Sequence, residues 1–402
     1  MKLLFVHGHE TMKEDFKGNF YTSGSYNDKV WSIYLKVFDE IEVMFRKDSY
    51  IYKEEHAKKI FQVFKHPKMT FSQIDNYYSS IRSFFNLKLR NEINRNLEEK
   101  VKTCDYLIAR LPSDVSRKAV QFAIKHKKPY LIELVGCPWN AYWFHSLKGK
   151  VLAPYNWYTN KQTLAKAKFV IYVTDKFLQA RYPNLQYNIG CSDVVLKNIN
   201  DEILENRLEK IKRRFFKEDQ SFTVGTIGPV DVKYKGQEFV IRAISELKKE
   251  GHNINYQIVG GGNNIRLRKV AENLNVLENI TFLSNMPHEN IFGYLDNIDL
   301  YIQPSLTEGL PRAVIESLSR ACPSIGTNVG GIPELVSDKN VFAAKDVLEI
   351  KKMIKMYKED YELNTKESIK AYRISKKYEN KVLENKKINF LLFFKEKGME
   401  NK

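Results

Sequence analysis

Two glutamates that lie close together in the sequence are the side chains whose type and spacing could do chemistry. Glu308 and Glu316 flank a Gly-Leu-Pro turn, and an apolar helical stretch opens at Pro311. A helix N-terminus carries partial positive charge on its N–H groups, which bind phosphate oxygens. The turn at Gly309-Leu310 is therefore predicted to direct N–H groups at a phosphate. The competing interpretation is structural, because a glutamate in the first turns of a helix commonly just complements its dipole.

Glycine-rich loops follow a series of short apolar runs between Ser221 and Val336. The runs alternate with amphipathic stretches, which predicts βαβ units and an open parallel sheet. Ligands of such sheets bind outside the carboxyl ends of the strands. One glycine loop there usually only ends a strand, but five in succession predict a nucleotide site. The predicted strands are Phe222–Thr226, Tyr256–Val259, Thr281–Leu283, Leu300–Gln303 and Ser324–Thr327, and the predicted helices are Gln237–Glu250, Ile265–Leu274 and Pro311–Ala321.

The first half contains a second set of short apolar runs with less regular spacing. Charged amphipathic stretches separate them, so this half is predicted to be another α/β layer. The polar loop from Gly18 and Asn19 to Gly24 and the lone His145 are candidate binding residues there. A plain surface loop and a structural histidine are the competing interpretations. The predicted strands are Lys2–Val6, Tyr106–Ala109, Tyr130–Val135 and Phe169–Val173, and the predicted helices are Asn91–Lys102 and, where the second half begins, Asp201–Arg214.

Charge is the unusual total of the composition. The 402 residues carry a formal net charge of +17, with 65 Lys and Arg against 48 Asp and Glu. Residues 1–195 hold 31 basic and 19 acidic side chains, whereas residues 196–402 hold 34 and 29. The first half is therefore expected to meet something anionic, and nucleic acid, lipid headgroups and phosphorylated substrates all qualify.

The sequence predicts neither an integral membrane protein nor a disulfide-rich secreted domain. The apolar runs Tyr130–Val135 and Ile388–Phe394 are far shorter than the roughly 18–20 residues that span a bilayer. The apolar start Met1–Val6 has no cleavage site, so no signal peptide is expected. Four widely spaced cysteines fit reduced thiols. We therefore expect a cytoplasmic protein, with the inner face of the plasma membrane as a candidate surface for its basic half.

The stretch from Glu308 to Glu316 resembles the signature of retaining nucleotide-sugar glycosyltransferases of glycosyltransferase family 4, the group 1 glycosyltransferases. The segment Phe222–Val336 resembles the donor domain of that family throughout, and the first half resembles the family only in outline. Gly228 through Lys235-Gly236 resembles its phosphate-binding stretch, Val259–Gly262 its second glycine turn, and Gly330–Glu334 its terminal motif.

The resemblance implies an α/β protein of GT-B fold, with two facing Rossmann-like domains, parallel sheets and an interdomain cleft. Residues 1–195 would form the acceptor-side domain and residues 196–375 the donor domain. Residues 376–402 would form a C-terminal helix that crosses back to the first domain. Because lysines flank its apolar run, an interfacial membrane helix is the alternative interpretation of this last segment.

The resemblance also implies roles for individual residues. Glu308 resembles the catalytic glutamate that contacts the transferred sugar, and Glu316 resembles the glutamate that accepts from both ribose hydroxyls. Lys235 would hold the diphosphate, whose negative charge grows as the sugar leaves. The other implied donor-binding residues are Gly228, Lys233, Gly309, Leu310 and Arg312, and the acceptor-side candidates are Gly18, Asn19 and His145. Because no DxD pair sits at a strand end, we expect neither a metal ion nor another cofactor.

One position departs from the family pattern. The family usually has Gly-Arg at the first loop, where the arginine also binds diphosphate, and here Pro229 follows Gly228. Lys233 could replace the lost charge, although a lysine lacks the bidentate geometry of an arginine. In the alternative, Lys233 is solvated and the site depends on Lys235, assisted by Arg312.

The implied activity is the transfer of a sugar from a UDP-linked donor to a hydroxyl acceptor, with retention of configuration. The implied acceptor is a glycan, such as a lipid-linked glycan of bacterial surface polysaccharide assembly, and an anionic membrane surface is a candidate partner. Two other classes remain open: a GT-B-fold sugar-nucleotide epimerase or phosphorylase, and a non-catalytic nucleotide- or nucleic-acid-binding protein. Nucleic acid is not expected as a partner, because the basic residues are scattered among acids and form no aromatic-interleaved stripe.

Overall fold

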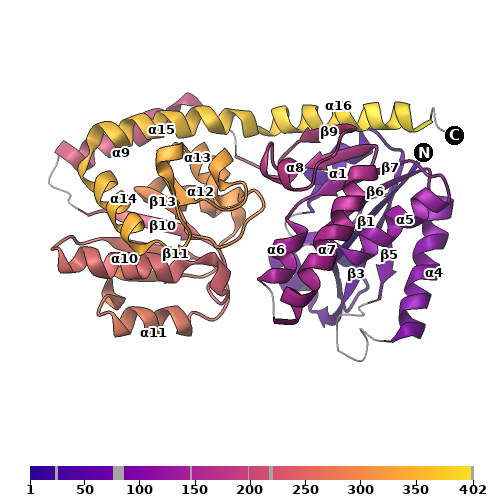
Figure 1. Ribbon diagram of the computed structural model, residues 1–402, viewed down its shortest axis with the longest axis horizontal. Helices are drawn as coiled ribbons and strands as arrows, with labels where there is room; N and C mark the ends of the chain where they lie inside the picture. The colour runs from indigo at the N-terminus through magenta and orange to yellow at the C-terminus, as the bar shows by residue number, and fades with distance from the viewer. Residues whose placement is uncertain (23–25, 76–85, 145–146, 198, 217–220, 400–402) are drawn as a thin grey trace. The chain divides into compact units, whose positions relative to one another are not determined.

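The protein folds as two units, described by a computed structural model for residues 1–22, 26–75, 86–144, 147–197, 199–216 and 221–399 (Figure 1). Unit 1 holds Met1–Cys191 together with Glu384–Lys402, and unit 2 holds Ser192–Leu383. The sequence-based limits at residues 195 and 375 lie four and eight residues from these divisions. The α/β class is confirmed, since both units are built on sheets with helices packed against them.

The sheet of unit 2 is parallel throughout its described strands, as predicted. Its order is β12-β11-β10-β13-β14-β15. Strands buried on both faces are rich in apolar residues and exclude charges, which is why the sequence located most of them within one residue. The exception is the short edge strand β15, which follows the predicted set. The strands are β10 (Thr223–Ile227), β11 (Asn255–Val259), β12 (Ile280–Leu283), β13 (Leu300–Gln303), β14 (Ser324–Thr327) and β15 (Val341–Phe342).

Amphipathic helices bury the faces of this sheet. In α10 (Gln237–Lys249), Val240, Ile244 and Leu247 recur at helical spacing and lie in the hydrophobic core. They pack there with Ile350 and Ile354 of α14. The remaining helices of unit 2 are α9 (Asp201–Phe216), α11 (Ile265–Asn273), α12 (His288–Asn297), α13 (Arg312–Ser319), α14 (Val347–Glu359) and α15 (Tyr361–Ser375).

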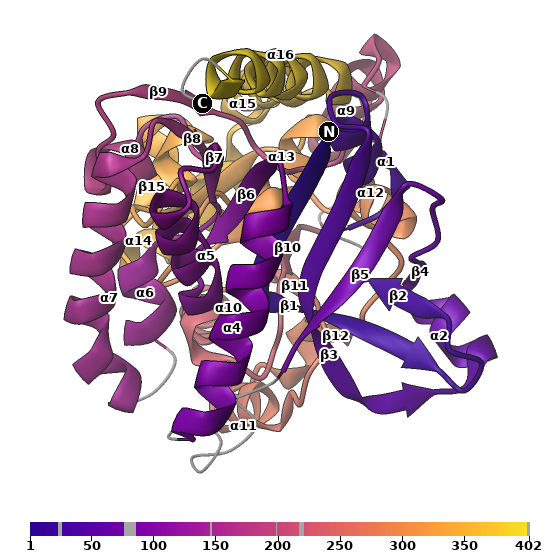
Figure 2. The same cartoon turned by 90° about the vertical axis from the view of Figure 1, so that its right-hand side faces the viewer.

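The main strands of the unit 1 sheet are parallel, as predicted, and two short antiparallel strands are added at one end. The first strand does not stop at Val6: β1 runs over Lys2–Asp15 and pairs in parallel with β3 (Glu40–Tyr52) and β6 (Tyr106–Leu111). At its far end β1 pairs antiparallel with β2 (Phe20–Thr22), which pairs antiparallel with β4 (Gln62–Val63). Figure 2 shows β2, β4 and α2 (Glu54–Ile60) together at one end of the sheet.

The other strands of unit 1 pair in parallel with their neighbours. Strand β5 (Met69–Ile74) extends the sheet beyond β3, while β7 (Tyr130–Leu134), β8 (Phe169–Tyr172) and β9 (Tyr187–Gly190) extend it beyond β6. The helices of this unit are α1 (Asp28–Leu35), α4 (Leu87–Thr103), α5 (Asp114–Lys125), α6 (Pro138–Trp143), α7 (Leu147–Lys166) and α8 (Phe177–Arg181).

The last helix, α16 (Asn380–Met399), packs its apolar residues on unit 1 beside β9 (Figure 1). Leu391 and Phe394 are fully buried. The Phe394 ring contacts Phe169 at 5.1 Å between centroids, and the Phe393 ring contacts Tyr187 at 4.8 Å. Leu392 is 47% exposed, but the other apolar residues of the run are buried or half-buried, which argues against an interfacial membrane role for α16.

Candidate functional site

A lysine and a glutamate from two different loops meet at the carboxyl edge of the unit 2 sheet. Lys235 follows β10 and ends a short 3-10 turn, and Glu308 follows β13. Lys235 Nζ donates a hydrogen bond of 2.7 Å to Glu308 Oε1, and both side chains are largely shielded from solvent. The two residues proposed to act on opposite ends of a sugar–diphosphate bond are thus adjacent.

Two further donors hold the same oxygen of Glu308. Gln303 Nε2, at the end of β13, donates to Oε1 over 2.9 Å, and Ser305 Oγ donates over 2.6 Å. Gln303 also donates to Ser305 Oγ and accepts from the buried Tyr301 hydroxyl. The carboxylate is therefore fixed by the strand end itself, and its position does not depend on Lys235.

The loops around this pair approach one another so closely that two positions require glycine. Gly236 has φ +71°, and a Cβ there would lie 2.0 Å from the Pro304 carbonyl oxygen. Gly330 has φ +63°, and a Cβ there would lie 2.3 Å from the Glu308 carbonyl oxygen. Left-handed backbone and these contacts exclude other side chains. The glycines thus bring the loops after β10, β13 and β14 together at one point.

Backbone hydrogen bonds connect the glycine loop after β10 to the glycine loop after β11. The Gly228 amide donates to the Val259 carbonyl over 2.8 Å, and the Val230 amide donates to the Gly261 carbonyl over 3.0 Å. Gln237 Nε2 donates to the Pro229 carbonyl over 2.9 Å. Pro229 is therefore accommodated in an ordered loop, beside which the Lys235 side chain packs on Gly228.

Lys233 lies at the start of the same 3-10 turn with an exposed side chain. Among the described residues it makes no ion pair, in contrast to Lys235. Its side chain does not bond to Glu308, whose described partners are Lys235, Gln303 and Ser305.

The helix that begins after the Gly309-Leu310 turn carries the second glutamate. Pro311 is the N-cap residue and α13 starts at Arg312, one residue later than predicted, with Arg312 exposed. Leu310 is half-buried, and the Gly309 carbonyl accepts from the Gly331 amide at 2.6 Å. Glu316 lies one turn into α13, is only 7% exposed, and bonds through Oε1 to His288 Nε2 at 2.9 Å.

Both glutamates lie near the end of β13. Burial, above all, raises the pKa of the Tyr301 phenol well above its ordinary value, and the negative charges of Glu308 and Glu316 both add to that rise. Glu308 is held by Lys235 and Glu316 by His288, so the two carboxylates have separate partners.

The acceptor-side candidates of unit 1 fare differently. Gly18 and Asn19 form a tight turn between β1 and β2 instead of an open loop. The Gly18 amide donates to the Asp15 carbonyl, and Asn19 donates to the Asp15 carboxylate from both its amide and its side chain. Phe20–Thr22 of the predicted loop form strand β2. His145 lies outside the described residues.

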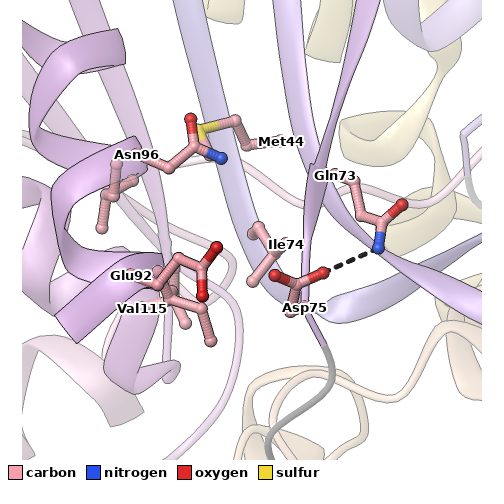
Figure 3. A pocket seen from close by; sticks show the side chains of 9 residues that line it. Met44, Gln73, Ile74, Asp75, Glu92, Asn96 and Val115 are labelled. Carbon is pink, nitrogen blue, oxygen red and sulfur yellow. Dashed lines mark hydrogen bonds between the residues drawn. The ribbon is translucent and has the colours of Figure 1, made fainter. Parts of the chain in front are cut away.

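Unit 1 contains a cavity of about 210 Å³ that the sequence did not predict. It lies between β3, the carboxyl end of β5 and α4. Figure 3 shows Glu92 of α4 and Asp75 beyond β5 on opposite sides, with Gln73 Nε2 donating to Asp75 Oδ1 over 2.8 Å. It is smaller than the roughly 300–1,000 Å³ typical of ligand sites, and it is not part of the donor loops, which belong to unit 2.

In the described part of the chain, no three His, Cys, Asp or Glu side chains gather in a way that could hold a metal ion. The helices described also include none that is both long and apolar enough to cross a bilayer.

Sequence reasoning missed three partners of the glutamates, namely Gln303, Ser305 and His288. Gln303 ends a predicted strand and Ser305 lies in the loop that follows it. Their bonds to Glu308 depend on the bend of the chain after β13, which the sequence pattern does not show. His288 begins α12, 28 residues before Glu316, and a lone histidine gives no spacing signal.

Comparisons with known proteins agree on the kind of protein. The model of the family described as glycosyl transferases group 1 matches residues 208–374. Protein CapJ of Staphylococcus aureus is 32% identical over 382 residues, which cover 93% of this chain and 92% of CapJ. The amylovoran biosynthesis glycosyltransferase AmsK of Erwinia amylovora is 31% identical over 109 residues, 25% of this chain and 27% of AmsK.

A solved structure shows the same fold over the whole chain. The crystal structure of HepE from Anabaena in complex with UDP and glucose superposes with a TM-score of 0.65 at 14% identity, covering 100% of this chain and 99% of HepE. The residues matched by the family model include Lys235, Glu308 and Glu316. The similarity to CapJ extends over nearly the full length of both proteins. The chain therefore belongs to the group 1 glycosyltransferases and has the GT-B fold.

Proposed function

We propose that the protein transfers a sugar from a UDP-linked donor to a hydroxyl of a lipid-linked glycan acceptor in surface polysaccharide biosynthesis, with retention of configuration and without a metal ion. The observation that carries the proposal is the Lys235–Glu308 pair at the carboxyl edge of the unit 2 sheet. In this proposal Lys235 is the cation for the leaving diphosphate and Glu308 is the carboxylate for the sugar, and the bond between them supports a shared site.

Negative charge develops on the leaving diphosphate as its bond to the sugar breaks, so positive charge is needed beside the phosphates. Lys235 supplies a mobile ammonium, and the start of α13 supplies the positive end of a helix dipole. When a diphosphate enters, Lys235 exchanges Glu308 for a phosphate oxygen. Gln303 and Ser305 keep Glu308 in place during this exchange, because both donate to its Oε1.

The donor and acceptor classes are proposed from the relatives. HepE was solved with UDP and glucose, and AmsK is named for the biosynthesis of amylovoran. Their fold and family are those of this chain, and the excess of basic residues in residues 1–195 favours an anionic acceptor such as a lipid-linked diphosphate. We place Glu316 on the ribose of the nucleotide and Glu308 on the transferred sugar.

Thermal unfolding with UDP, GDP or ADP, each in the presence of EDTA, tests the donor site. A nucleotide at 100 times its dissociation constant stabilises the fold by about 2.7 kcal/mol, which raises the unfolding midpoint measurably. We expect UDP to raise the midpoint of the wild type and to raise that of Glu316→Ala much less at the same concentration. A following assay of UDP-sugars with lipid-linked acceptors, with EDTA and then with added Mg²⁺ or Mn²⁺, tests transfer and its independence of metal.

The matched control is Glu289→Ala, which removes an exposed glutamate from the first turn of neighbouring α12. It should respond to UDP like the wild type. An unfolding midpoint that rises only with GDP would mean that the donor is a GDP-linked sugar and not a UDP-linked one. A midpoint that no nucleotide changes would contradict the proposed function.

A further inference from the structure

Helix α7 of unit 1 has an inverted distribution of polarity. The face that packs on the protein consists of Gly149, Ala153, Asn156, Asn160 and Leu164, which are small or polar except for the last. A helix that simply covers a core places its large apolar residues on that buried face. The exposed face of α7 carries them instead: Leu147 (81% exposed), Val151 (79%), Leu152, Tyr155 and Tyr158.

Helix α6 adds aromatic residues to this surface. Trp143 and Phe144, at its end, are exposed, and the Trp143 ring stacks on Trp139 at 5.2 Å between centroids. Three of the four tryptophans of the chain lie in α6 and α7. Tryptophan and tyrosine favour the boundary between headgroups and acyl chains, where one end of the ring is apolar and the other is hydrated.

The charge of this segment has one sign. Between Glu133 and Asp175 the sequence contains five lysines and no aspartate or glutamate. Lys150 Nζ lies 5.6 Å from the Trp143 ring and Lys161 Nζ lies 4.9 Å from the Trp157 ring, so cations border the aromatic residues. Asp114 of α5 is the acid that contacts this segment, through the Tyr142 hydroxyl of α6. An apolar, aromatic segment with a lysine border and no acid of its own is complementary to anionic lipid, because the rings enter the interface while the ammonium groups remain at the headgroups.

We propose that α6 and the exposed face of α7 form the surface by which the protein docks on an anionic bilayer. This surface, and not α16, enters the interface, since the apolar run of α16 is buried against unit 1. The inference rests on the proposed function in that docking brings the enzyme to a lipid-linked acceptor, although bilayer binding itself needs neither donor nor acceptor. Bilayer binding and donor binding can therefore fail separately.

Co-sedimentation with vesicles of phosphatidylglycerol, and in parallel with vesicles of phosphatidylcholine, tests the proposal on the full-length protein. The double substitution Leu147→Ser/Val151→Ser should weaken binding to phosphatidylglycerol by at least tenfold, on the order of what two apolar side chains contribute at an interface. Lys150→Gln should weaken it about fivefold, and only at low salt. The control is Leu185→Ser, which removes a leucine that is 94% exposed between α8 and β9, and it should bind like the wild type.

Three readouts decide the outcome. Equal thermal midpoints of the variants, and equal UDP-induced shifts, establish that fold and donor site are intact. Vesicle binding by the wild type that is lost in Leu147→Ser/Val151→Ser and kept in Leu185→Ser supports the proposal. A wild type that stays in the supernatant with phosphatidylglycerol, a double variant that binds as well as the wild type, or a wild-type dimer in gel filtration that Leu147→Ser/Val151→Ser converts to a monomer would overturn it.

Discussion

Lys235 Nζ lies 2.7 Å from Glu308 Oε1, and the carboxylate, not the ammonium, is the member of the pair that the fold holds in place. Lys235 is therefore free to change partner when a diphosphate enters. The substitution Lys235→Met should raise the dissociation constant of UDP roughly 10- to 100-fold, because a hydrogen bond to a charged group contributes about 1.5–3 kcal/mol. Isothermal titration with UDP measures this change.

Lys233→Met is the comparison within the same 3-10 turn. The Lys233 side chain is exposed, so its loss should raise the dissociation constant of UDP less than threefold. An effect as large as that of Lys235→Met would instead identify Lys233 as the replacement for the arginine that Pro229 displaces.

Glu308→Gln should separate binding from catalysis. Glutamine keeps the shape of the side chain and its bond to Lys235, while the negative charge beside the reacting sugar is lost. We expect kcat to fall about 100-fold, within the range found when one electrostatic contact to a transition state is removed. UDP affinity should stay within threefold of the wild type. Loss of UDP binding together with kcat would show that Glu308 positions Lys235 for the phosphates and does not act on the sugar.

Gly330→Ala tests whether loop contact positions Glu308. The new Cβ meets the Glu308 carbonyl oxygen and the backbone is left-handed, so unfolding free energy should fall by at least about 2 kcal/mol. Gly251→Ala is the matched control, because Gly251 has φ +82° but nothing within 4 Å of its Cβ position. The unfolding free energy of Gly251→Ala should fall by only about 1 kcal/mol, the cost of left-handed backbone for a residue with a Cβ. Urea unfolding of both variants gives the comparison, and equal losses would remove the steric argument.

A buried carboxylate connects α16 to unit 1 and gives a pH dependence. Glu133 Oε1 lies 2.9 Å from Lys387 Nζ of α16, and Arg110 lies 3.3 Å from the other oxygen. Burial acts to raise the pKa of Glu133, but the charges of Lys387 and Arg110 outweigh it and the pKa is lowered from 4.5. A lowered carboxyl pKa stabilises the fold above the unfolded pKa, and the stabilisation is lost as pH falls through the folded one.

The stability difference between wild type and Glu133→Gln should therefore be constant above pH 5 and shrink as pH falls below about 4.5, since glutamine does not titrate. Lys387→Met should cost about 3–5 kcal/mol at pH 7, because it leaves the buried carboxylate with Arg110 as its single charged partner. Urea unfolding at a series of pH values measures both. A difference that stays constant to pH 3 would mean that folding does not change the pKa of Glu133, and a difference that grows as pH falls would mean that the pKa is raised.

The sequence located the strands of unit 2 because these short runs are largely buried and contain no charged residue. It missed β3 because that strand carries charges among its apolar residues. Glu42 is buried in β3 and is held by Lys2 at 2.6 Å and Lys100 at 2.5 Å, and only the neighbouring strand and helix make this burial possible. The predicted end of the first strand at Val6 was wrong for a similar reason, since β1 continues through polar residues to pair with β3 and β2.

The site residues also differ in whether a local sequence pattern or a contact between distant segments defines them. Glu308, Glu316 and Lys235 belong to motifs with fixed spacing, so a single sequence sufficed to select them. His288 and Gln303 act through contacts across loops, and no spacing records these contacts. Helix α7 escaped prediction altogether because its large apolar residues face outward and its buried face is small and polar.

The bond between His288 and Glu316 predicts how the ribose is recognised. His288 occupies Oε1 of Glu316, so the ribose hydroxyls are expected to use mainly the other oxygen of this nearly buried carboxylate. Wild-type protein should bind UDP about tenfold more tightly than 2′-deoxy-UDP, the ratio for one charged hydrogen bond. Glu316→Ala should abolish that ratio, because the acceptor is gone.

His288→Ala separates positioning from direct contact. Without the imidazole, Glu316 keeps its charge but loses its fixed orientation, so affinity for both nucleotides should fall a few-fold while the preference for UDP over 2′-deoxy-UDP survives in part. His288→Gln, which can still donate to Oε1, should restore most of the affinity. Titrations with the two nucleotides give all four ratios. If His288→Ala removes the preference as completely as Glu316→Ala does, the histidine itself contacts the ribose, and Glu316 serves to orient it.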